Sequence, residues 1–167
     1  MLRMINPSLI IKDHFKTLRS NRNNKILWSD IIFLCGTPAI ASAGIVVAKW
    51  RMAGVSNLLA ALALLAGLLF NLLVLMFDVA RKAAAGTGGQ TSQNLKFVLT
   101  QQLQANVTYA LFVSLMAVLV LGAESSTGSE RMPVWTSAIL AYLLIHFTLT
   151  LFMILKRIKS VFDNEFR

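Results

Sequence analysis

Four long apolar stretches dominate the sequence and limit the folds that it can adopt. They lie at about residues 28–48, 58–77, 107–123 and 134–155. A helix needs about 20 mainly apolar residues to cross a hydrocarbon core of roughly 30 Å. Each stretch meets or approaches this length, so we predict an all-α membrane protein with four transmembrane helices, cytoplasmic helical extensions and a symmetric homo-oligomeric assembly.

The composition excludes several other classes of protein. Hydrophobic residues make up 56% of the chain and charged residues only 14%, whereas about 25% of a typical soluble domain is charged. An ordinary soluble enzyme and a disordered protein are therefore excluded. Cys35 is the single cysteine, which excludes an internal disulfide and a cysteine-based metal site.

The basic residues predict how the chain crosses the membrane. Of 16 lysines and arginines, only Lys49, Arg51 and Arg131 fall in the first and third connections. The other thirteen lie in the N-terminal segment, the middle loop and the tail: Arg3, Lys12, Lys16, Arg19, Arg22, Lys25, Arg81, Lys82, Lys96, Lys156, Arg157, Lys159 and Arg167. Cytoplasmic loops carry an excess of Lys and Arg. We therefore expect a multi-pass protein of the bacterial inner membrane with both termini in the cytoplasm.

These features divide the chain into five parts. They are a basic amphipathic segment (1–27), transmembrane helices 1 and 2 (28–79), a cytoplasmic helical hairpin (80–106), transmembrane helices 3 and 4 (107–156) and a cytoplasmic tail (157–167). A cleaved signal peptide is an alternative for the first stretch, since Ala39 and Ala41 imitate a small-residue cleavage site. The long basic segment before the stretch and Asp30 within it argue against cleavage.

A short helix is predicted in the N-terminal segment. Pro7 suits the first helical position after Asn6. Beyond it, apolar residues recur on one face and basic residues on the other: Ile11, Phe15 and Leu18 against Lys12, Lys16 and Arg19. Such a helix lies on anionic lipid, packs on the cytoplasmic ends of neighbouring subunits, or binds a polyanion.

Polar residues inside the apolar stretches are candidates for function, because they are costly in lipid. Asn71 and Asp78 share a face of the second stretch with Gly67. Asp30 and Thr37 share a face of the first stretch with three small residues, Ala41, Gly44 and Ala48. We predict that Asp30, Thr37, Asn71, Asp78 and His146 line a pore or gate.

Each of these residues also has a structural interpretation. Asn71 can hydrogen-bond a neighbouring helix. Asp78 can pair with Arg81 or Lys82 as a solvated charge at a helix end. His146, which shares one side of the fourth stretch with Tyr142 and Thr150, can be a packing residue. In the first stretch Pro38 removes a backbone hydrogen bond and frees the carbonyl near Leu34.

Motifs of catalysis are missing from the sequence. It contains no His-Glu-x-x-His, no Gly-x-Ser-x-Gly and no paired intramembrane aspartates. His14 and His146 are expected to lie far apart in depth as well as in sequence. We therefore expect no enzyme activity, no cofactor and no metal site.

The segments FNLLVLMFDVARK and QLQANVTYALFVSL, with the basic N-terminal helix and the helical middle hairpin, give the chain a recognisable architecture. It resembles the small four-span effectors of bacterial anti-phage defence, most of all the channel effector of Hailong-type systems. Membrane accessory proteins of CRISPR systems share this architecture. The Hailong resemblance implies a homotetrameric ion channel, opened by a short DNA oligomer that a partner nucleotidyltransferase makes.

A cationic cytoplasmic surface would suit such a single-stranded oligonucleotide or nucleotide activator. The residues that we expect to bind it are Arg19, Arg22, Lys25, Arg81, Lys82, Lys156 and Arg157. The positive-inside rule alone also places Lys and Arg at this level. Two other functions stay open: a non-conducting membrane adaptor that recruits a soluble partner, and a small transporter subunit.

Overall fold

The computed structural model describes residues 7–18, 28–85, 90–128 and 131–165, although the side chains of residues 28, 79–80, 82–99 and 160–165 lie outside this description. These described residues form five helices: α1 (Pro7–Lys16), α2 (Trp28–Val47), α3 (Val55–Ala85), α4 (Gln90–Ser125) and α5 (Val134–Glu165). No strand occurs among them. The prediction of an all-helical protein is confirmed.

Four of the helices are long and apolar enough to cross a membrane. The qualifying segments are Ser29–Val47, Val55–Asp78, Thr100–Ser125 and Val134–Lys159. They agree with the four predicted spans in length and composition, and the second, third and fourth extend beyond the expected limits. In the region predicted as the middle hairpin, α3 continues to Ala85 and α4 begins at Gln90.

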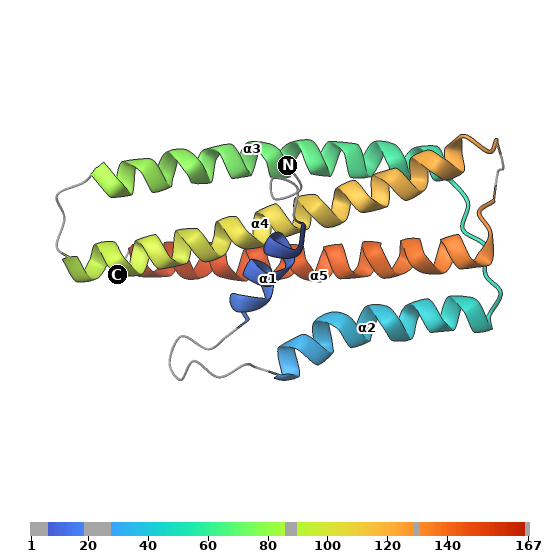
Figure 1. Cartoon of the computed structure of the whole chain (residues 1–167), viewed down its shortest axis with the longest axis horizontal. Coiled ribbons are helices and arrows are strands. Elements are labelled where there is room, and N and C mark those ends of the chain that lie inside the picture. Colours follow the sequence, from blue (N-terminus) through green and yellow to red (C-terminus); the bar gives the residue numbers. More distant parts are fainter. Residues whose placement is uncertain (1–6, 19–27, 86–89, 129–130, 166–167) are drawn as a thin grey trace.

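The four long helices lie in one open layer, in the order α3, α4, α5, α2 (Figure 1). Within the described part of the chain, α2 packs on α5 and α3 packs on α4, but α2 and α3 do not contact each other. The chain runs in opposite directions along α2 and α3 (Figure 1). The layer therefore has two different edges, one made by α2 and the other by α3.

The inner helices α4 and α5 carry most of the core. Val107 and Leu121 on α4 and Leu140 on α5 have no exposed surface. Helix α3 contributes a narrow stripe, Val55, Leu62 and Leu69, whose spacing of seven residues keeps them on one face. Most of α2 and α3 faces outward, as expected of helices at the edges of a layer.

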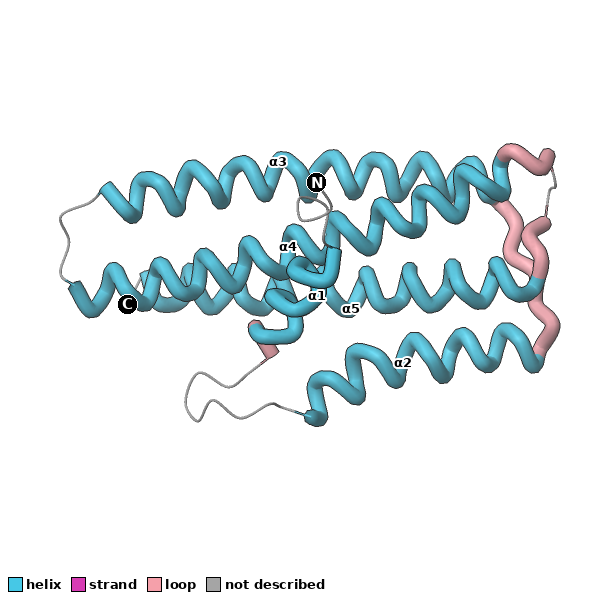
Figure 2. The backbone as a smooth tube through the Cα atoms, viewed as in Figure 1, coloured by secondary structure: helices cyan, strands magenta, loops and turns pink. Residues whose placement is uncertain are grey.

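The first and third connections lie at the same end of the layer (Figure 2), where hydrogen bonds hold the first connection to the third and to α5. The Met132 N–H donates to the carbonyl of Met52 across 2.9 Å, and the Met52 N–H donates to Ser137 Oγ across 3.0 Å. Helix α2 ends with Lys49 in a left-handed conformation, and Trp50 N bonds Ile45 O. This is the usual geometry of a helix terminus.

Helix α1 crosses α4 near the middle of the layer (Figure 1). Its start at Pro7 is as predicted. Its inner face differs from the expected one, because His14 is fully buried and Ile11 is exposed. Leu18, which also belongs to the expected apolar face, is buried as predicted. The inner face of α1 therefore carries His14, which is hydrogen-bonded to Asn106, and does not carry Ile11 as the sequence predicts.

Candidate functional site

Three of the predicted pore residues are exposed on the two helices that form the edges of the layer. Asp30 and Thr37 are exposed on α2, and Asn71 is exposed on α3. The shared faces expected from the sequence are therefore the faces that a single chain leaves uncovered. Gly67, one turn before Asn71, has nothing within 4 Å of the position where a Cβ would stand. Because the two edges are separated by α4 and α5, one chain does not bring these residues together.

Asp78 lies at the end of the second span. Its Oδ1 is 4.0 Å from Nη2 of Arg81, one turn later on α3. The Arg81 side chain is 77% exposed and the Asp78 side chain 42% exposed, and solvent-accessible pairs of this kind contribute little to stability. This contact agrees with the structural interpretation of Asp78 as a charge at a helix end.

The fifth predicted pore residue, His146, is buried between three helices. Its Nε2 lies 2.7 Å from the hydroxyl of Tyr109 on α4, and its Nδ1 lies 3.1 Å from the carbonyl of Leu34 on α2. A carbonyl only accepts, so Nδ1 carries the proton and Nε2 accepts from the tyrosine hydroxyl. His146 therefore holds α2, α4 and α5 together.

The two histidines are linked through Tyr109. The rings of His14 and Tyr109 stack with their centroids 3.8 Å apart and 9° between their planes. The edge of Tyr109 meets His146 at 5.6 Å and 79°. The expectation that the histidines lie far apart in depth is wrong, because α1 folds back against the middle of α4.

Asn106 is the partner that allows His14 to be buried. Its Oδ1 lies 2.9 Å from His14 Nδ1 and 2.8 Å from Thr17 Oγ1. Both His14 and Asn106 have no exposed surface. His14 Nε2 and Asn106 Nδ2 are the two buried side-chain atoms for which the described residues provide no hydrogen-bond partner.

Burial also changes the acidity of His14. Removal from water lowers the pKa of His14 from 6.5 to about 4. The hydrogen bond with Asn106 acts in the opposite direction, while the nearby His146 and Arg157 lower the pKa further. Desolvation is the dominant cause because it penalises the imidazolium form. His14 is therefore neutral at neutral pH in this structure.

Arg157 fixes the end of α1 to the layer. Its Nη1 donates to Gln102 Oε1 on α4 across 2.9 Å, and its Nη2 donates to the carbonyl of Thr17 across 2.5 Å. A cation near the C-terminal end of a helix is also favoured by the helix dipole. We predict Arg157 as a ligand residue from the sequence; in the structure its guanidinium is used within the chain.

The other predicted ligand residues are only partly described. Arg81 is exposed near the end of the layer where α3 and α4 are connected, and Lys156 is exposed on α5 beside Arg157. Lys82 lies in α3, but its side chain is outside the description. Arg19, Arg22 and Lys25 fall outside the described residues altogether.

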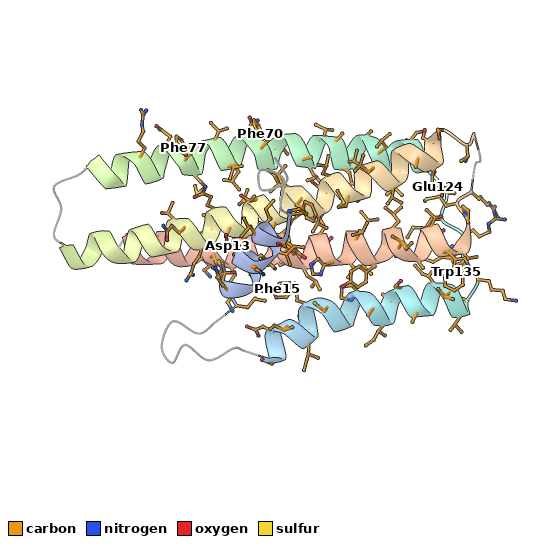
Figure 3. The ribbon with its side chains drawn as sticks, viewed as in Figure 1. Asp13, Phe15, Phe70, Phe77, Glu124 and Trp135 are labelled. Carbon is orange, nitrogen blue, oxygen red and sulfur yellow. The ribbon has the colours of Figure 1, made fainter. Side chains whose placement is uncertain are left out.

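A polar groove of about 580 Å³ lies between α1 and α4. Its walls carry amide, hydroxyl and oppositely charged groups: Asp13, Lys16, Thr17, Gln101, Gln102, Gln104 and Thr108. Figure 3 shows Asp13 and Phe15 on the helix that crosses the layer at this point. Lys16 Nζ and Asp13 Oδ1 are 3.0 Å apart, which neutralises the two charges. The groove can accept a polar molecule but has no strong charge of its own.

The polar contacts around His14 and His146 do not form a cluster of metal-ligating side chains. In the described ranges, no three His, Cys, Asp or Glu side chains gather as a metal site would require. The contacts of His14, Asn106, Tyr109 and His146 instead fix α1 in position relative to α2.

Sequence reasoning missed Asn106, Thr17 and Tyr109. Asn106 and Tyr109 are three residues apart and so share a face of α4. The sequence did contain a signal for this cluster, namely two polar residues on one helical face at the start of an apolar stretch. Their partners lie 92 and 37 residues away along the chain, for His14 and His146 respectively, which local patterns do not reveal.

Comparison of the chain with protein-family models, with curated proteins and with solved structures finds no match.

Proposed function

We propose that this chain is the subunit of a homo-oligomeric ion channel of the bacterial inner membrane. The observation that carries the proposal is the open layer with polar residues on its two outer edges. A single layer of four helices encloses no path for ions. Thr37 and Asn71 lie within spans, where an exposed polar group is costly in lipid. Several copies around an axis would cover these groups or place them beside water.

The distribution of charge supports an orientation with both termini in the cytoplasm. In the described helices, Arg81, Lys82, Lys96, Lys156, Arg157 and Lys159 belong to the half of the layer where α3 and α4 are connected. Lys49, Arg51 and Arg131 belong to the opposite end. All three cations of the second group lie in short connections. The larger basic group faces the cytoplasm under the positive-inside rule.

We further propose that a cytoplasmic nucleotide or single-stranded oligonucleotide opens the channel, so that infected cells lose their membrane potential. This part rests on the resemblance to the Hailong-type effector, which also implies a tetramer and a partner nucleotidyltransferase. The α1–α4 groove and the exposed Lys156 and Arg81 offer polar and cationic contacts between the middle of the layer and its proposed cytoplasmic end.

Two measurements test the proposal. The first is the symmetry of the purified protein in nanodiscs, where a ring supports conduction and a monomer contradicts it. The second is membrane potential in expressing cells, read with a voltage-sensitive dye. Asn71→Ala and Asp78→Ala should alter depolarisation, whereas Val74→Ala, an exposed apolar position on the same helix, should not.

The competing function is a non-conducting adaptor that recruits a soluble partner. An adaptor leaves the membrane potential intact on expression. Proteoliposomes that stay impermeable to ions with and without a short single-stranded DNA oligomer would favour the adaptor over the channel. A transporter subunit would instead accumulate a substrate without depolarisation.

A further inference from the structure

The two edges of the layer differ in chemistry. Helix α2, at one edge, exposes the carboxylate of Asp30, which as an anion only accepts hydrogen bonds. The edge of α3 carries the carboxamide of Asn71, which donates as well as accepts. Both side chains are exposed in the single chain. Lipid explains exposed apolar residues, but it does not explain Asn71, which lies within the span Val55–Asp78.

The two groups also lie at the same level of the layer. Asp30 is in the first turn of α2, and Asn71 follows Phe70 on α3. Figure 3 shows that the start of α2 is level with Phe70 along the long axis of the layer. Rotation about an axis parallel to the helices keeps every residue at its level. If the α2 edge of one copy meets the α3 edge of the next, these residues therefore come to lie at the same level.

The antiparallel course of α2 and α3 extends this register along both edges. Seven residues after Asp30 is Thr37, and seven residues before Asn71 is Leu64. A further step of seven reaches Gly44 and Asn57. All six positions are exposed in the single chain, and steps of seven keep each series on one helical face.

From these observations we infer that α2 of one copy packs against α3 of the next copy, in a head-to-tail contact that pairs Asp30 with Asn71 and Thr37 with Leu64. The open surface at Gly67 allows the two backbones to approach closely. A two-fold contact of α2 with α2 would instead bring two Asp30 carboxylates together. Head-to-tail contacts between unlike edges generate rings when the rotation closes.

This contact rests on the homo-oligomer of the proposed function but not on ion conduction. A ring that crosslinks as inferred and leaves the membrane potential intact would uphold the contact and overturn the channel. Depolarisation without the inferred crosslinks would do the reverse.

Disulfide crosslinking in native membranes tests the register. Cys35 is the single cysteine, so Cys35→Ala gives a cysteine-free background. Into it are placed the pairs Asp30→Cys with Asn71→Cys and, independently, Thr37→Cys with Leu64→Cys. The second pair keeps the test valid if loss of the polar residues impairs assembly. Mild oxidation should convert each pair from monomer into a ladder of dimers and larger species.

The matched control is Asp30→Cys with Leu64→Cys, which uses the same two edges but is out of register by about two turns, or about 10 Å. It should stay monomeric, as should each single cysteine. Dimers from Asp30→Cys alone would overturn the inference in favour of a two-fold α2 contact. Monomers from both registered pairs, or equal ladders from the control, would also overturn it.

Discussion

Nδ1 of His146 donates a hydrogen bond to the main-chain carbonyl of Leu34, across 3.1 Å. Pro38 stands four residues after Leu34 and has no N–H, so α2 itself offers this carbonyl no helical donor. A side chain of α5 thus supplies the hydrogen bond that α2 lacks. Because Nε2 of the same ring accepts from Tyr109 on α4, one imidazole joins three helices.

Tyr109→Phe is expected to destabilise the protein by about 1–3 kcal/mol, because it leaves Nε2 of a buried histidine without its donor. Thermal unfolding in detergent measures the effect as a lower Tm. Tyr142→Phe is the matched control, since Tyr142 stacks on the same imidazole at 5.8 Å but does not provide the bond to Nε2. Equal losses in the two variants would contradict the role given to the Tyr109 hydroxyl.

Pro38→Ala is expected to weaken the dependence of α2 on His146. Alanine restores an N–H that competes for the Leu34 carbonyl. His146→Gln should therefore lower the free energy of unfolding less in the Pro38→Ala background than in the original protein. Groups that share a partner typically show coupling of about 0.5–3 kcal/mol. A double-mutant cycle of unfolding free energies measures it, and strictly additive losses would contradict the shared acceptor.

The length and polarity of the apolar stretches were enough to predict the four spans. The same reasoning identified the carbonyl freed by Pro38, because proline acts on a residue at a fixed distance along the chain. It could not identify the donor, since His146 lies 112 residues from Leu34. Local rules thus located the unpaired group, and tertiary packing selected the group that satisfies it.

The position of α1 shows the same limit. Apolar periodicity favoured Ile11 and Phe15 for its inner face, yet the structure buries His14 because Asn106 and Tyr109 provide a hydrogen bond and a stacked ring. The order of the helices was equally hidden. Asn71 and Thr37 were recognisable as polar residues on definite faces, but nothing local indicates that α2 and α3 occupy opposite edges.

Arg157→Gln is expected to loosen α1 by about 1.5–3 kcal/mol, the range for a hydrogen bond made by a charged group. Its donors serve Gln102 and the Thr17 carbonyl, and glutamine cannot reach both in the same way. Faster proteolysis at Lys12 and Lys16 reports the loss. Lys156→Gln removes an equal charge from an exposed neighbour and should leave the rate of proteolysis unchanged. Similar acceleration in both variants would contradict the proposed role of Arg157 in holding α1.

The neutral state of His14 makes the docking of α1 sensitive to acid. An undocked His14 titrates near 6.5, whereas burial lowers the pKa of docked His14 to about 4. Between these values the undocked state binds more protons, so docking is fully favourable above 6.5 and weakens as the pH falls toward 4. The loss over this window is on the order of 3 kcal/mol.

A spin label on α1 is expected to gain mobility as the pH falls from 6.5 toward about 4. Leu9→Cys, an exposed position on α1, carries the label in the Cys35→Ala background, and electron paramagnetic resonance in nanodiscs measures the mobility. His14→Gln is the control, because its amide can bond Asn106 but does not titrate. The pH dependence should disappear in that variant even if α1 is looser at every pH. A transition of the same size in His14→Gln would assign the acid sensitivity to another group and contradict the role of His14.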